Sequence, residues 1–161
     1  MDTAAGVDAR LPIRSDLDLV WVRQHVRQSA ATLGFGLVEQ TKLVTAASEL
    51  ARNTLVYGGG GQLTVHRVTR GRVPGLRLSF GDEGPGIVDV EQALRDGYTS
   101  GDGLGMGLGG ARRLVHEFAI DSTPGAGTTV TVTSWATRPP YPAYPPPPPV
   151  PPVPPAAREE S

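Results

Sequence analysis

Glycine is unevenly distributed along this chain, and its three clusters restrict the fold more than any other feature. The clusters cover residues 58–61, 81–86 and 97–110, and each one interrupts a segment with regular apolar spacing. Glycine adopts backbone conformations that other residues avoid, and it lets a ligand approach the main chain closely. The clusters therefore predict three specialised loops within a domain of helices and strands.

The proline distribution sets the limit of that domain. Twelve of the sixteen prolines fall between Pro139 and Pro155, where neither helix nor central strand can form. We predict one domain over residues 10–136, a disordered N-terminus over residues 1–9 and a proline-rich disordered tail over residues 137–161. The tail is either a solubilising extension or a polyproline ligand for an aromatic-lined groove.

Charge and composition exclude several classes of function. The net charge is −1, so no basic excess indicates a nucleic acid or an anionic membrane surface as partner. The absence of cysteine excludes disulfides and thiolate metal sites, and the three histidines lack the spacing of metal ligands. We find no signal peptide and no apolar run near the roughly 20 residues that span a bilayer. We therefore expect a cytoplasmic protein.

Apolar periodicity predicts a mixed α+β domain with late paired strands and helices on one face. Ser15 is the expected N-cap of the first long helix, with Asp18 in its first turn. Turns are expected around residues 71–75 and 124–127. The predicted helices cover residues 16–33, 37–57, 90–95 and 107–117, and the predicted strands cover residues 11–14, 62–68, 76–80, 118–122 and 128–134.

Glu49 and Asn53 lie four residues apart in the second predicted helix, so their side chains share one face. The amide oxygen of asparagine can coordinate a hard cation such as Mg²⁺. The carboxylate can orient an attacking hydroxyl or accept its proton. Taken alone, the pair is also compatible with an ordinary solvated helix surface.

Asp82 opens the run Asp-Glu-Gly-Pro-Gly-Ile at residues 82–87, directly after the predicted strand 76–80. A carboxylate at a strand end can accept a hydrogen bond from an exocyclic amine such as that of adenine. The glycines that follow would let the backbone approach the ligand. An ordinary acidic turn is the alternative interpretation.

The third glycine cluster opens the last predicted helix, at residues 101–110. Backbone N–H groups at a helix N-terminus bind anions, so this segment predicts a phosphate site with a mobile lid. Gly105, Gly107 and Gly110 also match the dinucleotide-binding G-x-G-x-x-G motif, but that motif must follow a buried strand and here it follows a polar loop. The chain has neither a P-loop nor the motifs of eukaryotic-type kinases.

The four-residue segment 125–128, Gly-Ala-Gly-Thr, separates the last two predicted strands. It is a hairpin turn by itself, or it places the Thr128 hydroxyl beside an adenine. In their order along the chain, the four segments resemble the nucleotide site of the GHKL superfamily of gyrase B, heat-shock chaperones, MutL and histidine kinases. Residues 45–57, 82–87 and 96–99 further resemble the RsbT-type switch kinases, serine/threonine kinases of bacterial stress and sigma-factor signalling. The resemblance covers roughly residues 10–136.

This resemblance implies a Bergerat-type α/β sandwich with a mixed sheet and helices on one face. It implies that ATP and Mg²⁺ bind, with Glu49 as catalytic carboxylate and Asn53 as the Mg²⁺ ligand. Asp82 would receive the adenine amine, supported by Thr128. The other nucleotide-binding residues that it implies are Gly84, Gly86, Gly103, Gly105, Gly107 and Leu108.

Members of that group phosphorylate a serine or threonine of a small STAS-domain antagonist protein, and some, once released from it, activate a phosphatase. A sigma-factor regulator is the other partner that the fold accommodates. We therefore expect an ATP-dependent serine/threonine kinase of a partner-switching pathway. A non-catalytic module that sequesters its partner and a plain ATPase remain open. The intact pair of Glu49 and Asn53 favours the kinase, because binding alone does not need the carboxylate.

Overall fold

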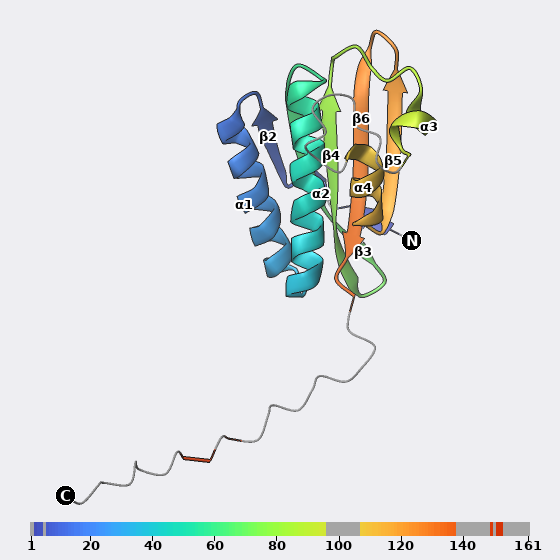
Figure 1. The fold of residues 1–161 in the computed structure, drawn as a ribbon. Coiled ribbons are helices and arrows are strands. Elements are labelled where there is room, and N and C mark those ends of the chain that lie inside the picture. Colours follow the sequence, from blue (N-terminus) through green and yellow to red (C-terminus); the bar gives the residue numbers. More distant parts are fainter. Residues whose placement is uncertain (1, 5, 96–106, 138–148, 150, 153–161) are drawn as a thin grey trace, which may run out of the picture.

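The computed structural model describes residues 2–4, 6–95, 107–137, 149 and 151–152. These residues form two layers, in which helices cover one face of a sheet (Figure 1). The α/β sandwich predicted from the sequence is confirmed. The helices are α1 (Asp16–Thr32), α2 (Leu37–Val56), α3 (Val90–Ala93) and α4 (Gly107–Arg113), and the strands are β1 (Asp2–Ala4), β2 (Ala9–Ile13), β3 (Gly61–Arg70), β4 (Val73–Asp82), β5 (Glu117–Thr123) and β6 (Gly127–Trp135).

The sheet has the strand order β1-β3-β4-β6-β5, and β2 also pairs with β3. Every pairing among the described strands is antiparallel, so the predicted mixed sheet is wrong in this respect. The chain crosses over through α3 and α4 between β4 and β5, which run in the same direction. The β5–β6 hairpin then inserts β6 between them, and no parallel neighbours result. β1 also lies in the segment that the sequence predicts to be disordered.

The first helix begins as its sequence predicts. The Ser15 side chain accepts the Asp18 N–H at 3.4 Å, and Asp18 Oδ2 accepts the Ser15 N–H at 3.1 Å. This reciprocal capping box satisfies donors that the first turn of a helix leaves open. α1 ends before Gly34, whose φ of 89° lets the chain turn into α2.

The β3–β4 hairpin is longer and tighter than its predicted form. Arg70 pairs with Val73, so the turn is confined to residues 71–72. The predicted turn over residues 71–75 is therefore wrong at Val73, Pro74 and Gly75, which lie in β4. Gly75 packs against the indole of Trp135, where an added Cβ would come within 2.8 Å of a ring carbon.

The extended ladder also changes the position of Asp82. The sequence places Asp82 after a strand that ends at residue 80, whereas the structure makes it the last residue of β4, paired with Gly61 of β3 and Thr128 of β6. The strand backbone therefore fixes this carboxylate more firmly than a loop would.

The fourth helix is shorter than predicted. α4 ends at Arg113, and Glu117, expected in the helix, begins β5. Glu117 pairs with Thr133 across the sheet, and its Oε2 accepts the Trp135 indole N–H at 2.9 Å. These contacts with β6 hold Glu117 in a strand, although the spacing of the preceding apolar residues predicts a helix.

The core lies between the helices and the covered face of the sheet. Ala46 and Ala47 are small enough to let α2 lie close to the strands. Among the described helices, none has the length and apolar character needed to cross a membrane. The largest fully buried side chains include Ile13, Leu43, Leu50, Leu63, Leu76, Leu78 and Phe80.

Candidate functional site

Asp82 is held rigidly at the end of β4. Its Oδ1 accepts two backbone N–H groups, from Gly84 at 2.9 Å and from Thr128 at 3.2 Å. Two donors on one oxygen fix the orientation of the carboxyl group. The second oxygen, Oδ2, accepts no hydrogen bond from the described residues and can face a ligand.

Thr128 lies across from Asp82 in the antiparallel ladder, so the structure brings these two predicted site residues together. The Thr128 hydroxyl is 2.8 Å from Ser122 Oγ, and that oxygen also accepts the Ile87 N–H at 2.7 Å. Ser122 thus ties β5, β6 and the loop after Asp82 into one unit. Ser122 was not predicted as a site residue, although its place near the end of the penultimate strand could have indicated it.

Three glycines pack closely around Asp82. A Cβ at Gly58 would lie 2.6 Å from Asp82 Oδ2, and one at Gly84 would lie 2.7 Å from the Gly58 Cα. A Cβ at Gly127, where φ is 109°, would collide with the Asp82 carbonyl. Gly84 was predicted for this site, but Gly58 and Gly127 were not. They permit a packing density around Asp82 that side chains would prevent.

The C-terminus of α2 links Asn53 to the Asp82 cluster, which consists of Asp82, Gly58, Gly84, Ser122, Gly127 and Thr128. The Asn53 carbonyl accepts the N–H groups of Tyr57 at 2.9 Å and of Gly58 at 3.2 Å, and Gly58 lies against Asp82. The Asn53 side chain is half-buried and has no hydrogen-bond partner among the described residues.

Mg²⁺ fits this arrangement. Within the described residues, no group of three or more histidine, aspartate or glutamate side chains forms a protein cage for a metal. Mg²⁺ in nucleotide sites is usually held by one or two protein oxygens, with substrate phosphates and water completing the shell. An unpaired amide oxygen on α2 is a ligand of that kind.

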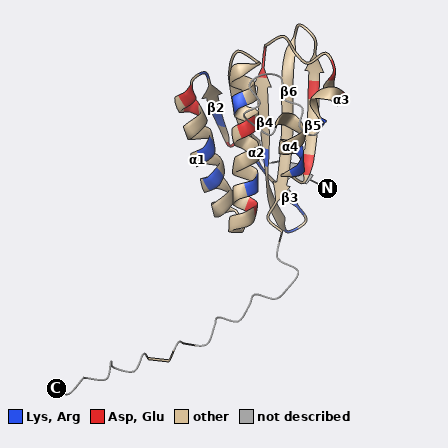
Figure 2. Ribbon diagram, viewed as in Figure 1, with Lys and Arg blue, Asp and Glu red and all other residues tan. Residues whose placement is uncertain are grey.

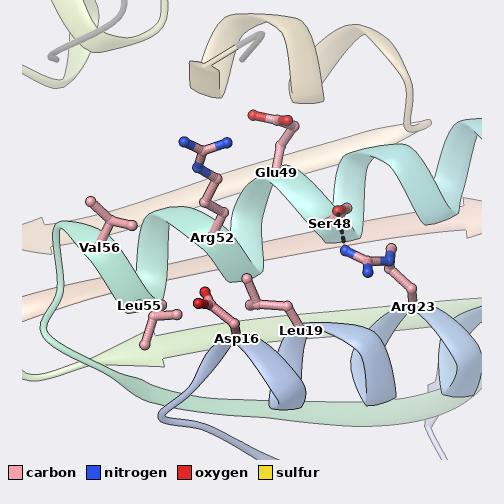
Figure 3. Close-up of a pocket in the computed structure, with 8 residues that line it drawn as sticks. All are labelled: Asp16, Leu19, Arg23, Ser48, Glu49, Arg52, Leu55 and Val56. Atoms are coloured by element: carbon pink, nitrogen blue, oxygen red, sulfur yellow. Dashed lines mark hydrogen bonds between the residues drawn. The ribbon is translucent and has the colours of Figure 1, made fainter. Parts of the chain in front are cut away.

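Glu49 lies one turn before Asn53 on α2 and is also half-buried. Among the described residues its carboxylate has no hydrogen bond or ion pair. It opens onto a pocket of about 290 Å³ between α1 and α2 (Figure 3). The pocket is lined by Asp16, Leu19, Arg23, Ser48, Glu49, Arg52, Leu55 and Val56.

This pocket is separate from the cluster around Asp82, because neither Asn53, Asp82 nor Thr128 lines it. The structure therefore joins Asp82, Gly84 and Thr128 through direct hydrogen bonds and links them to the main chain of Asn53 through Gly58. Glu49 lies one turn before Asn53 on α2, at the edge of the pocket between α1 and α2.

The predicted phosphate-binding segment is described only in part. Gly103 and Gly105 lie outside the described residues, whereas Gly107 opens α4 with a φ of 68° and Leu108 is buried. α4 packs against α2, on which Glu49 and Asn53 lie. Gly86, also with positive φ, lies against the main chain of Thr123.

We predict that Gly58→Ala disturbs this site. The new Cβ would force the Asp82 carboxylate or the end of α2 to move, so we expect a loss of about 1–3 kcal/mol in the free energy of unfolding. ATP affinity should fall as well. Thermal unfolding and nucleotide titration measure the two effects separately.

Gly81→Ala is the matched control, because Gly81 neighbours Asp82 and a Cβ there would make an ordinary 3.7 Å contact with Thr129 Oγ1. If Gly58→Ala bound ATP as well as Gly81→Ala does, tight packing of Asp82 would not matter for the site.

Comparison with known proteins shows the family of this chain. Residues 38–138 match the family model of the histidine kinase-, DNA gyrase B- and HSP90-like ATPases. The serine/threonine-protein kinase RsbT of Bacillus subtilis is 42% identical over 123 residues, which cover 76% of this chain and 92% of RsbT. An anti-sigma F factor of Bacillus licheniformis is 30% identical, over 70% of this chain and 81% of the relative.

A solved structure supports the fold. The crystal structure of the RsbU and RsbW domains of a Mycobacterium tuberculosis protein superimposes with a TM-score of 0.56 at 22% sequence identity. The match covers 86% of this chain and 33% of that one. The chain therefore belongs to the histidine kinase-, DNA gyrase B- and HSP90-like ATPase family and, within it, to the RsbT-type serine/threonine-protein kinases.

Proposed function

We propose that the chain transfers the γ-phosphoryl group of ATP to a serine or threonine of a STAS-domain antagonist protein. The catalytic unit is residues 10–136, and the reaction belongs to a bacterial partner-switching pathway in the cytoplasm. Once the phosphorylated antagonist releases the kinase, the kinase activates a phosphatase. The observation that carries the proposal is the Glu49 carboxylate, which has no partner among the described residues and lies one helical turn from Asn53.

The adenine end of ATP is read by the Asp82 cluster. Asp82 Oδ2 accepts the exocyclic amine, while Gly84 and Thr128 hold the other oxygen. The Thr128 hydroxyl, fixed by Ser122, faces the same base. Because the Gly84 and Thr128 N–H groups fix the orientation of the Asp82 carboxyl group, little ordering of this side chain is needed on binding.

The phosphate end lies toward α2 and α4. Asn53 and the main chain at Gly107 would hold the metal and the phosphates, together with the predicted contacts at Gly103 and Gly105. Bound Mg²⁺ would neutralise charge on the phosphate oxygens. The protein thus mainly positions groups and stabilises charge, as phosphoryl transfer requires.

Glu49 acts on the incoming hydroxyl. Its carboxylate accepts the hydroxyl proton as the acceptor oxygen forms a bond to the γ-phosphorus. The bond from that phosphorus to the β–γ bridging oxygen breaks, and ADP leaves with the electron pair. The proton ends on Glu49 and passes to solvent through the pocket that this residue lines.

The test is incubation of the full chain with γ-labelled ATP, Mg²⁺ and candidate STAS-domain proteins. Label on one of these proteins supports the kinase. A stable complex without transfer would favour the sequestering module that the names of the anti-sigma F relatives suggest. Release of free phosphate without a labelled protein would favour an ATPase.

A further inference from the structure

Arg52 lies between the proposed catalytic centre and the pocket that separates α1 from α2. On an α-helix each residue advances by about 100°, so Asn53 lies about 40° to one side of Glu49 and Arg52 about 60° to the other. Glu49 therefore stands between the proposed Mg²⁺ ligand and Arg52. In the proposed kinase the nucleotide would lie on the Asn53 side of the carboxylate, and Arg52 lies on the opposite side.

The pocket faces that opposite side. The residues of α2 that line it are Ser48, Glu49, Arg52, Leu55 and Val56. On the helical wheel these residues fill a sector of about 120° centred near Arg52, and Asn53 lies outside it. Figure 3 shows Arg52 and Glu49 extending from the same side of α2, while Asp16, Leu19 and Arg23 reach the pocket from α1.

The two arginines of the pocket differ in their contacts. Arg23 donates to Ser48 Oγ at 3.4 Å and so belongs to the pocket wall. Arg52 is exposed and has no hydrogen bond or ion pair within the described part of the chain. Both signs of charge are interspersed on α1 and α2 in Figure 2, so the pocket does not belong to a broad basic surface. Of the two arginines, Arg52 is thus the one whose guanidinium is left to a ligand, while the carboxylates of Asp16 and Glu49 line the same pocket.

We propose that this pocket receives the acceptor segment of the protein substrate, and that Arg52 binds the carboxylate of an acidic residue beside the acceptor hydroxyl. A hydroxyl that attacks the γ-phosphorus must reach Glu49 from the side away from the nucleotide, which is the Arg52 side. A guanidinium pairs with a carboxylate through two parallel hydrogen bonds, which fix orientation as well as position. Leu19 and Leu55 give the pocket apolar walls for neighbouring aliphatic groups. This inference rests on the proposed kinase function.

The test compares Arg52→Gln with wild type, using the STAS-domain protein that wild type phosphorylates. Arg52→Gln should raise the KM for this acceptor about tenfold or more, the effect of losing one charged hydrogen-bonded pair. The KM for ATP should stay unchanged, and Arg52→Lys should give an intermediate acceptor KM. Arg27→Gln is the control, because Arg27 is an exposed arginine of α1 outside the pocket.

A double-mutant cycle identifies the partner group. Replacing the acidic residue next to the phosphorylated hydroxyl by alanine should raise the acceptor KM as much as Arg52→Gln does. Combining the two changes should add little more. An unchanged acceptor KM in Arg52→Gln, or a rise in the KM for ATP instead, would overturn the proposal; the latter would make Arg52 a phosphate ligand.

Measuring the affinity of the complex tests the proposed docking site separately from the proposed kinase activity. If wild type forms a complex with a STAS-domain protein but transfers no phosphate, the kinase assignment fails. Calorimetry of the same pair still tests the docking site, since Arg52→Gln should then weaken the complex about tenfold or more. The docking site would be overturned if wild type and Arg52→Gln bound the STAS-domain protein with equal affinity, or if wild type formed no complex with it.

Discussion

Replacing Glu49 by glutamine is expected to slow phosphoryl transfer by about 10²- to 10⁴-fold, the contribution of a positioned general base. Glutamine has the size of glutamate and a similar helix propensity, so α2 should keep its structure. It cannot accept a proton from the hydroxyl. The affinity for ATP should stay near that of wild type, because Glu49 lies outside the contacts that hold the Asp82 cluster together.

The measurement is single-turnover transfer from γ-labelled ATP to the acceptor protein, with ATP affinity determined separately by titration. Glu39→Gln is the matched control, since Glu39 is the other glutamate of α2 and lies about 15 Å away along the helix. Its Oε2 accepts the Thr137 N–H at 3.2 Å, and glutamine can still accept that bond. Undiminished transfer by Glu49→Gln would move the catalytic role to another residue.

Local sequence signals predicted those parts of the fold that depend on neighbours in the chain. The Ser15 cap of α1 and the apolar face of α2 follow from short-range spacing, and the structure has both as expected. The buried face of α1 was predicted only in part, because Val22 is buried with Val26 and Ala30 whereas Leu17 and Trp21 are exposed. The Asp82 and Thr128 segments were each ambiguous alone. Only their order, through the resemblance to a known family, predicted that they meet. The antiparallel register then pairs the two residues directly.

What the sequence did not predict depends on contacts between distant segments. Glu117 lies in a strand and not in the predicted helix, because it pairs with Thr133 and Trp135 of β6. Gly58 looked like one loop glycine among four, and only its contact with Asp82 distinguishes it. The pocket beside Glu49 needs two helices to pack at a particular angle, which no local pattern reports. The periodicity of the sequence predicts which face of a helix or strand is apolar. Which residues of distant segments come into contact depends on how those faces pack.

Replacing Asp82 by asparagine is expected to weaken ATP binding by about 10- to 150-fold, because a hydrogen bond to a charged group contributes about 1.5–3 kcal/mol. The structure makes the orientation of the new amide predictable. The two N–H donors of Gly84 and Thr128 need an acceptor, so the amide oxygen should take the place of Oδ1. The amide NH₂ would then replace Oδ2 and meet the adenine amine donor to donor.

The same reasoning predicts a change in base preference for Asp82→Asn. This change distinguishes altered base recognition from a loss of the structure of the site. Inosine triphosphate carries a carbonyl oxygen where ATP carries the amine, so the carboxylate of wild type should repel it. The NH₂ of Asp82→Asn should donate to that oxygen, and the ratio of affinities should shift toward inosine triphosphate. Calorimetric titration with each nucleotide and Mg²⁺ measures this ratio, and Glu83→Gln, at the exposed neighbouring residue, is the control. If Asp82→Asn weakened both nucleotides equally, Asp82 would support the fold of the site without reading the base.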